Sequence, residues 1–280
     1  MIDEKAQGLG EIIGRVKSIV RNWNPTPSKA EELWFRGQAK TQYELLPGLY
    51  RLHNAVFNYD EENLFERFKA SGSPYTDEKI KTYWDWYFLA QHHGLPTRLL
   101  DWTENLLAAI YFALAEYLET GDRREHDAEL AALPATPLYD LDSPAVWILD
   151  AGSLNQVSCG PSEDYIITPG GDLTAKFLPA NIADKSPANR YPLAILPPHT
   201  NERIVAQQGV FTVHGHDRQS IDQLASSSSG STIKLARIKL DRANLARLWE
   251  ELELTGINRL ALFPDLDSAA YCTKWFGQHV

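Results

Sequence analysis

The sequence has little cysteine and no long apolar run. Its two cysteines in 280 residues, Cys159 and Cys272, are far apart and show no Cys-x-x-Cys spacing. This usage argues against a disulfide framework and favours reduced thiols in a cytoplasmic protein. The longest apolar-rich run, Leu106 to Leu118, contains Glu116 and is shorter than the about 20 residues of a membrane-spanning helix. The first residues, Met1 to Lys5, are acidic and polar. We therefore expect neither export nor membrane insertion.

The chain has fewer basic than acidic residues, and several familiar motifs are absent. The chain has 27 Lys and Arg against 37 Asp and Glu, a net charge of -10. This balance repels phosphate polymers and argues against general nucleic-acid binding, although a local basic patch would survive it. No Gly-x-x-x-x-Gly-Lys, Gly-x-Ser-x-Gly or His-Glu-x-x-His occurs. Their absence removes the common ATPase, hydrolase and zinc-peptidase interpretations.

What is present indicates a folded chain, with 44% hydrophobic and 23% charged residues. Apolar spacing and capping residues predict helices at 9–23, 60–70, 77–91, 104–119 and 241–254, and a last one after Pro264. Asp77 and Thr103 are the predicted N-caps of two of them. Apolar β-type runs predict strands at 32–36, 145–149, 191–196, 210–214 and 232–238. The prediction is an α+β fold with helices packed around a small mixed or antiparallel sheet.

The chain has no internal repeat and no long linker, so we expect one domain over residues 1–280. Within it, residues 1–30 form an N-terminal helical segment. Residues 120–144 are first charged and then rich in Ala and Pro, and they show no helical or strand periodicity, which indicates a surface insertion. Residues 152–189 are rich in Gly, Pro, Ser and Asp, and we expect mostly loop there.

The first candidate for chemistry is Trp34–Gln38, an apolar strand that ends in Arg36 and Gly37. Arginine suits phosphate or carboxylate because its planar fork donates two parallel hydrogen bonds. Glycine lets backbone approach a ligand closely, because it has no Cβ. The alternative is that Arg36 pairs with a buried carboxylate and fixes the strand.

The second candidate is Gln91–Thr103, which places amide, imidazole, guanidinium, carboxylate and hydroxyl groups between two apolar helices. A polar cluster in such surroundings must be internally satisfied. One interpretation is a structural network in which Arg98 pairs with Asp101. The other is the lining of a site, with His92 or His93 as acid or base. Adjacent helical residues point about 100° apart and no third ligand is recognisable, so we predict no metal.

Two further segments carry polar groups. In Asn201–Thr212, Gln207 and Gln208 lead into a strand, where they would present hydrogen bonds to a flat polar ligand or simply cap a turn. Phe263–Ser268 has two acids at a strand-to-helix turn, and Asp267 or its neighbouring serine as an N-cap explains much of it.

Taken together, these segments resemble the FRG domain, a mostly prokaryotic family named for its Phe-Arg-Gly. The residues that carry the resemblance follow the family's order over nearly the whole chain, and the longest motif is highly specific. They are Phe35–Gln38, Tyr43–Leu49, Gln91–Thr103, Ala109–Ala113, Gln207–Thr212 and Leu262–Asp267.

More distantly, Arg36-Gly37 is similar to the first motif of arginine-type ADP-ribosyltransferases, whose Arg holds a phosphate of NAD. Thr103 followed by 109–113 is similar to their middle motif, although the usual Ser-Thr-Ser is replaced here. Glu202, ahead of Gly209 and Phe211, occupies a place comparable to that of their late glutamate.

This second resemblance implies an ADP-ribosyltransferase-like fold and NAD as substrate. A carboxylate would stabilise the oxocarbenium-like cation formed when the nicotinamide–ribose bond breaks. The implied catalytic residues are Arg36, Thr103, Glu202 and Gln208. The implied NAD-contacting residues are Arg36, Gly37, Gln38, His92, Arg98, Trp102, Tyr111 and Phe211. The substitutes for Glu202, should it be exposed, are Asp101, Asp265 and Asp267.

Three functions remain open on the sequence. An NAD-using transferase or hydrolase, acting on a nucleotide, nucleic-acid or protein acceptor, predicts that Arg36, the 91–103 turn and the 202–211 segment converge on one pocket. A non-catalytic sensor of a nucleotide or a protein partner predicts a pocket without a positioned carboxylate. A metal-dependent nuclease requires that Asp101, Asp265 and Asp267 meet.

Overall fold

The structure is a computed structural model that describes residues 1–24, 32–53, 60–76, 80–118, 139–198 and 202–276. Asp77, predicted to be an N-cap, and most of the 120–144 insertion lie outside the described residues.

A seven-stranded mixed sheet forms the centre of the molecule, in the order β1-β7-β4-β2-β3-β6-β5. Its first strand pairs parallel with β7, and the other neighbours are antiparallel. The sheet therefore pairs an N-terminal strand with a strand that lies more than 200 residues further along the chain. The mixed sheet with its helices confirms the predicted α+β class. The strands are β1 (Ile2–Ala6), β2 (Leu33–Gln38), β3 (Leu99–Thr103), β4 (Ala145–Asp150), β5 (Leu193–Ile195), β6 (Gly209–Val213) and β7 (Leu235–Leu240).

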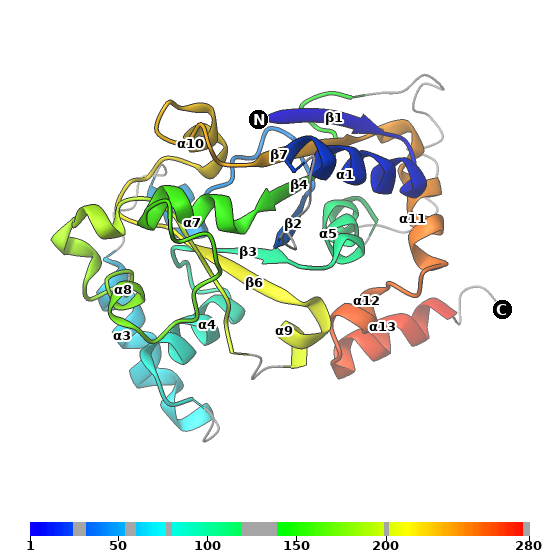
Figure 1. Ribbon diagram of the computed structural model, residues 1–280. Helices are drawn as coiled ribbons and strands as arrows, with labels where there is room; N and C mark the ends of the chain where they lie inside the picture. The colour runs from blue at the N-terminus through cyan, green and yellow to red at the C-terminus, as the bar shows by residue number, and fades with distance from the viewer. Residues whose placement is uncertain (25–31, 54–59, 77–79, 119–138, 199–201, 277–280) are drawn as a thin grey trace.

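Helices cover both faces of this sheet (Figure 1). They are α1 (Leu9–Trp23), α2 (Gly48–His53), α3 (Glu61–Gly72), α4 (Tyr83–His92), α5 (Leu106–Leu118), α7 (Ala151–Cys159), α8 (Asp172–Ala175), α9 (Glu202–Gln207), α10 (Ile221–Ser226), α11 (Leu245–Glu253), α12 (Arg259–Leu262) and α13 (Leu266–Phe276). Short 3-10 turns occupy Ser73–Tyr75, Ile182–Asp184, Pro187–Asn189 and Arg242–Asn244.

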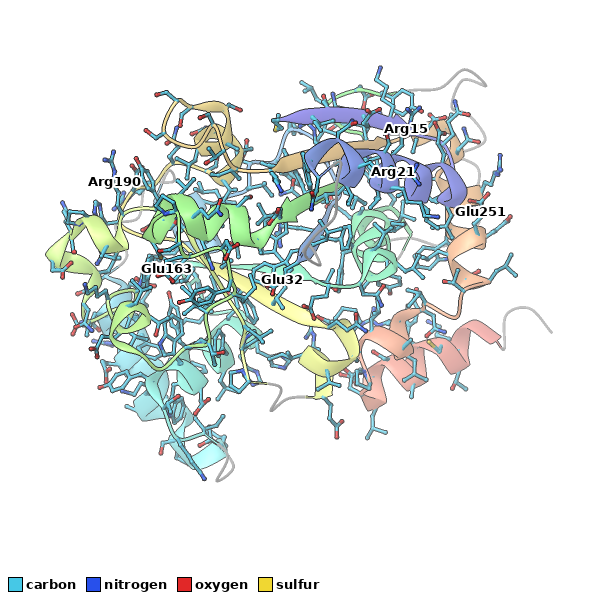
Figure 2. The ribbon with its side chains drawn as sticks, viewed as in Figure 1. Arg15, Arg21, Glu32, Glu163, Arg190 and Glu251 are labelled. Carbon is cyan, nitrogen blue, oxygen red and sulfur yellow. The ribbon has the colours of Figure 1, made fainter. Side chains whose placement is uncertain are left out.

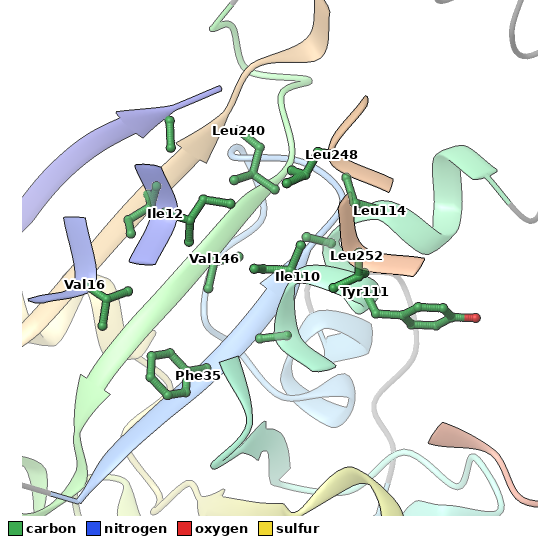
Figure 3. Packing of buried hydrophobic residues seen from close by; sticks show 14 of the residues in the cluster. Ile12, Val16, Phe35, Ile110, Tyr111, Leu114, Val146, Leu240, Leu248 and Leu252 are labelled. Carbon is green, nitrogen blue, oxygen red and sulfur yellow. The ribbon is translucent and has the colours of Figure 1, made fainter. Parts of the chain in front are cut away.

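The largest core cluster packs α1, α5 and α11 against one face of the sheet (Figure 3). Ile12 and Val16 contribute from α1, as the helical spacing of the sequence predicts. The opposite side of α1 carries charged residues such as Arg15, which pairs with Glu11 at 3.1 Å (Figure 2). Glu251 on α11 accepts a hydrogen bond of 2.7 Å from the main chain of Leu9, which satisfies one of the free donors at the start of α1.

Alternation along the strands sends neighbouring residues to different clusters. Trp34 belongs to a cluster under α7 and α10, whereas Phe35 belongs to the cluster under α5. A third cluster packs α3 and α4 against β3, β5 and β6, with Leu99 and Phe211 among its members. The face that carries Phe35 is therefore covered by two groups of helices. One group is α1, α5 and α11, the other is α3 and α4, and the centre of the sheet lies between the two groups.

Two predicted helix starts are wrong. Helix α4 begins at Tyr83 rather than near residue 77, because Thr82 forms a capping box with Asp85, an arrangement that satisfies two free main-chain donors. Helix α5 begins at Leu106, and Thr103 is not its N-cap but the last residue of β3. The Asn105 side chain instead accepts hydrogen bonds from the first turn of α5.

The predicted loop at 152–189 is also wrong in part. Helix α7 follows β4 directly, and its N-cap Asp150 accepts a hydrogen bond from Ser153. Its buried residues include Leu154 and Asn155, and the Asn155 amide binds main-chain groups of Tyr165 and Ala194. Small and polar residues therefore face inward here, so the helix has little of the apolar periodicity by which helices are recognised.

Candidate functional site

A cavity of about 360 Å³ lies over the centre of the sheet, where the two helical groups face each other. Strands β2, β3 and β6 form its floor, and α4, α5 and α9 form its walls. Four of the predicted motifs contribute to it, so Arg36, the 91–103 turn and the 202–211 segment do converge. The lining residues are Phe35, Arg36, Gly37, Phe88, Gln91, His92, Asp101, Trp102, Thr103, Phe112, Arg203, Ile204, Gln207, Gly209 and Phe211.

Arg36 lies where β2 and β3 are least tightly joined. These strands pair at a single position, Phe35 with Thr103, whereas β2 and β4 pair at every residue of β2. The Arg36 side chain links the two strands, because its Nη1 donates to the main-chain oxygen of Asp101 at 2.6 Å. The guanidinium is thus held by the backbone and is fixed in place in the cavity wall.

The charge of this guanidinium is only partly balanced. Its Nη1 lies 4.0 Å from the Asp101 Oδ2, and that carboxylate is 58% exposed. The Arg36 Nε is buried and finds no hydrogen-bond partner among the described residues. Burial lowers the pKa of Arg36 from its ordinary value; the charge of Asp101 opposes this and that of Arg51 adds to it. A half-buried cation in this state gains from an incoming anion.

Two more cationic or titratable groups face the same space. Arg203 reaches the cavity from α9 and stacks on the Phe263 ring at 4.3 Å. Burial lowers the pKa of Arg203, while the charges of Asp101 and Asp265 oppose the shift. Burial also lowers the pKa of His92, and Arg203 adds to the effect. The cavity is thus a basic site in a chain of net charge -10, which selects for a small anion over a phosphate polymer.

Asp101 supplies the carboxylate of the cavity. Its Oδ2 accepts a hydrogen bond of 2.9 Å from the Gln91 amide. Nothing in the described part of the chain donates to its other oxygen, Oδ1. The side chain is therefore fixed by one oxygen and open at the other.

Aromatic rings complete the lining. Phe88 on α4 and Phe211 on β6 are nearly parallel, with centroids 5.2 Å apart and an interplanar angle of 27°. Trp102 is held by its Nε1, which donates to Thr212 Oγ1 at 3.1 Å. The Phe112 ring contributes from α5. Flat rings next to buried cations suit a ligand that combines a ring with an anionic group.

Six of the predicted site residues line this cavity. They are Arg36, Gly37, His92, Trp102, Thr103 and Phe211. The Thr103 hydroxyl has a structural part to play, because it donates to the main-chain oxygen of Gln207 at 2.6 Å and accepts from Asn105 at 2.9 Å. Thr103 therefore ties α9, with its Arg203, to the end of β3.

The other predicted residues lie elsewhere. Glu202 and Gln208 are exposed and do not line the cavity. Tyr111 is buried in the core, with its ring 5.3 Å from that of Trp249. Gln38 is buried and binds the Trp147 indole at 2.7 Å. Asp101, which the sequence analysis named as a substitute for Glu202, lies beside Arg36 in the cavity.

Arg98 belongs to a buried network on the far side of α4, and its predicted pairing with Asp101 is wrong. Its Nε donates to Glu61 Oε2 at 2.6 Å. The Nη1 and Nη2 groups donate to the main-chain oxygens of His214 and Phe177. Tyr87 donates to the same Glu61 carboxylate. Arg98 thus links α3, the end of β6 and the turn at Phe177 that follows α8. Its side chain is only 1% exposed and does not line the cavity.

The sequence did not single out Gln91, Phe88 or Arg203 as site residues, whereas Gln207, named as a possible ligand contact, does line the cavity. Arg203 and Gln207 lie on α9, in a stretch that we expected to lead straight into a strand. Residues four apart on a helix share a face. If a helix is assumed here, the spacing of Arg203 and Gln207 therefore predicts that both side chains face the same cavity.

We expect acid to destabilise the fold through His214. This side chain is fully buried, and burial, together with the nearby charge of Arg98, lowers its pKa to about 3. The unfolded histidine takes up a proton below its ordinary pKa of about 6.5. Stability is therefore complete above that pH and falls as the pH drops toward 3. Between pH 7.5 and 5 the loss should be about 2 kcal/mol.

Urea unfolding of the wild type and of His214→Gln at these two pH values measures this contribution. The variant should lose about 2 kcal/mol less than the wild type over this interval. Equal losses in the two proteins would show that His214 is not the group responsible.

Comparison with known proteins finds a family model that matches part of the chain. The family model described as FRG domain matches residues 31–122, which is 92 of the 280 residues. Ten of the fifteen cavity-lining residues fall inside this segment, and the five from α9 and β6 fall outside it. No curated protein and no solved structure matches the chain.

No helix among the described residues has the length and apolar character to cross a bilayer. The same residues contain no group of three or more His, Cys, Asp or Glu side chains placed to hold a metal ion.

Proposed function

We propose that the cavity binds NAD and that the protein breaks the bond between nicotinamide and ribose, for hydrolysis or for transfer of ADP-ribose. The observation that carries this proposal is the position of Arg36 and Asp101, a fixed cation and a fixed carboxylate 4.0 Å apart in one cavity.

The chemistry needs both charges. Arg36, with Arg203 opposite, suits the pyrophosphate, because guanidinium groups bind phosphate oxygens through parallel hydrogen bonds. Breaking the glycosidic bond leaves its electron pair on the nicotinamide nitrogen and positive charge on the ribose carbon. The Asp101 carboxylate stabilises that developing cation. Water or an acceptor hydroxyl then attacks the same carbon and releases its proton to Asp101 or to solvent.

The size of the cavity limits how much of NAD it encloses. At about 360 Å³, it lies near the lower end of the range of about 300–1,000 Å³ for small-molecule sites. One nucleotide half of NAD fits this space, with a ring against Phe88 and Phe211. Asp101 is 58% exposed, so water or an acceptor reaches the reacting carbon from outside.

The alternatives receive less support. A non-catalytic sensor predicts a pocket without a positioned carboxylate, whereas Asp101 is held by Gln91 beside Arg36. A metal-dependent nuclease needs several acids together. Asp265 caps the start of α13, where it accepts a 2.7 Å hydrogen bond from Ser268, and it does not line the cavity.

Calorimetric titration of NAD, together with an assay for released nicotinamide, tests the proposal. Arg36→Ala should weaken NAD binding by about ten- to a hundredfold, because it removes a charge-assisted contact with phosphate. Arg36→Lys, which keeps the charge but not the fork, should lie in between and guards against misfolding of the alanine variant. Asp101→Asn should retain binding and lower the rate of nicotinamide release by about a hundredfold or more.

Arg247→Ala is the matched control, since this arginine is 67% exposed on α11, where it pairs with Glu251 and does not line the cavity. Its NAD affinity should equal that of the wild type. Absence of NAD binding by the wild type at millimolar concentration would refute the proposal. Unchanged affinity in folded Arg36→Ala and Arg36→Lys would also refute it.

A further inference from the structure

A chain of hydrogen bonds runs from β3 through the 94–97 turn and α4 back to the cavity carboxylate. The main-chain N–H of Leu99 donates to Thr97 Oγ1 at 3.0 Å. The Thr97 hydroxyl in turn donates to Gln91 Oε1 at 2.6 Å. The Gln91 Nε2 then donates to Asp101 Oδ2 at 2.9 Å. Thr97 is buried, with 1% of its surface exposed.

This chain allows only one orientation of the Gln91 amide. The Thr97 hydroxyl accepts from the Leu99 N–H and donates its one proton to Gln91 Oε1. The reversed amide would place the Gln91 oxygen against the Asp101 carboxylate, where neither atom can donate. It would also leave the Thr97 hydroxyl facing an NH2 group.

We infer that Gln91, oriented by Thr97, is a positioning residue that holds one oxygen of Asp101 and leaves the other directed to the ligand. The inference rests on the proposed function for its catalytic consequence. Asp101 is fixed at two points, since its main-chain oxygen accepts from Arg36 and its Oδ2 accepts from Gln91. The free Oδ1 is then the atom that meets a ribose hydroxyl or the cationic ribose carbon.

This chain of hydrogen bonds from Thr97 through Gln91 to Asp101, called the relay below, explains why these residue types occur together. An ionised group that must stabilise charge in a transition state is most effective when it does not need to reorient. Exposed carboxylates rotate freely, and Asp101 is more than half exposed. The hydrogen bond from Gln91 removes that freedom, and the buried Thr97 keeps the amide from turning over.

Paired substitutions at Thr97 test the orientation. Thr97→Ser keeps the hydroxyl and should leave kcat and KM within about twofold of the wild type. Thr97→Val removes the donor to Gln91 Oε1, so the Gln91 amide loses one of its two anchors, and kcat should fall about tenfold while KM changes less than about twofold. Equal kcat in the two folded variants would overturn the inference.

Gln91→Glu gives a readout that a purely structural role would not move. Thr97 can still donate to one new oxygen, but the other then faces Asp101, and two adjacent carboxylates resist being ionised together. The acid limb of the pH profile of kcat should therefore move upward by about one pH unit. An unmoved limb in a folded Gln91→Glu protein would contradict the inference even if NAD cleavage is confirmed.

The side-chain amide signal of Gln91 in NMR spectra separates this inference from the function on which it rests. Hydrogen exchange of that NH2 group should be slow in the wild type and in Thr97→Ser, and faster in Thr97→Val. If the wild type does not cleave NAD but the exchange rates follow this order, the function fails and the relay stands. Equal exchange in all three proteins overturns the relay, whatever the outcome with NAD.

Discussion

Arg98→Met should lower the free energy of unfolding by about 3–5 kcal/mol, the cost of breaking a buried ion pair by removing one partner. The Arg98 side chain is 1% exposed and that of Glu61 is 10% exposed. Burial alone would lower the pKa of Arg98, but the charge of Glu61 outweighs it and raises that pKa. Methionine fills most of the space but leaves Glu61 charged and two carbonyl oxygens without a donor. Urea unfolding followed by circular dichroism measures the loss.

Two controls make this result specific. Arg247→Met removes a 67% exposed arginine and should change stability by less than about 0.5 kcal/mol. Asp101→Asn tests the pairing that the sequence predicted, and it too should have little effect on stability, because Arg98 pairs with Glu61. A large loss in Asp101→Asn with little loss in Arg98→Met would reverse the assignment of the buried pair.

The fold could be predicted from the sequence wherever apolar residues follow a period. Helix α1 has the predicted bounds, because Ile12, Val16 and Ile19 form a buried stripe at helical spacing. Strands β2, β4 and β6 were placed within a few residues. The misplaced starts of α4 and α5 depend on which of several neighbouring Asp, Asn or Thr side chains caps the helix. That choice is decided by local geometry, which composition does not fix.

The strand β1 was not predicted. Three charged residues, Asp3 to Lys5, stand in a row between Ile2 and Ala6, so the segment has little apolar character and no apolar alternation. It is stabilised by its partner, since β7 runs parallel beside it. The bonds that hold Asp3 come from Arg237 and Lys239 on β7, more than 230 residues away in the chain. A strand of this kind exists because of tertiary contacts, which local sequence cannot report.

The candidate site was found at the level of segments but not of individual residues. Arg36, Asp101 and Arg203 were all in the predicted motifs, because polar groups between apolar elements mark a lined cavity or an internal network. The sequence could not separate those two cases for Arg98. Only the fold shows that Arg98 pairs with Glu61, while Asp101, three residues later, has its own partners.

Gly37→Ala should have the second large effect, a loss of about 3 kcal/mol or more in the free energy of unfolding. A Cβ at this position would lie 1.9 Å from the main-chain oxygen of Ala109 and 2.5 Å from the main-chain nitrogen of Ala113. Both atoms belong to the backbone of α5, so no side-chain rotation relieves the clash. The sequence predicted that Gly37 permits a close backbone approach to a ligand. In the structure, the backbone that approaches Gly37 closely is that of helix α5.

The consequence extends to the cavity, because α5 must move away from β2 to admit the new methyl group. Phe35 and Phe112 line the cavity from these two elements, so NAD affinity should fall together with stability. Gly14→Ala is the matched control: Gly14 is exposed in the middle of α1 with nothing within 4 Å of an added Cβ. That change should raise stability by about 0.5–1 kcal/mol. If Gly37→Ala were as stable as the wild type, α5 could not lie as close to β2 as described.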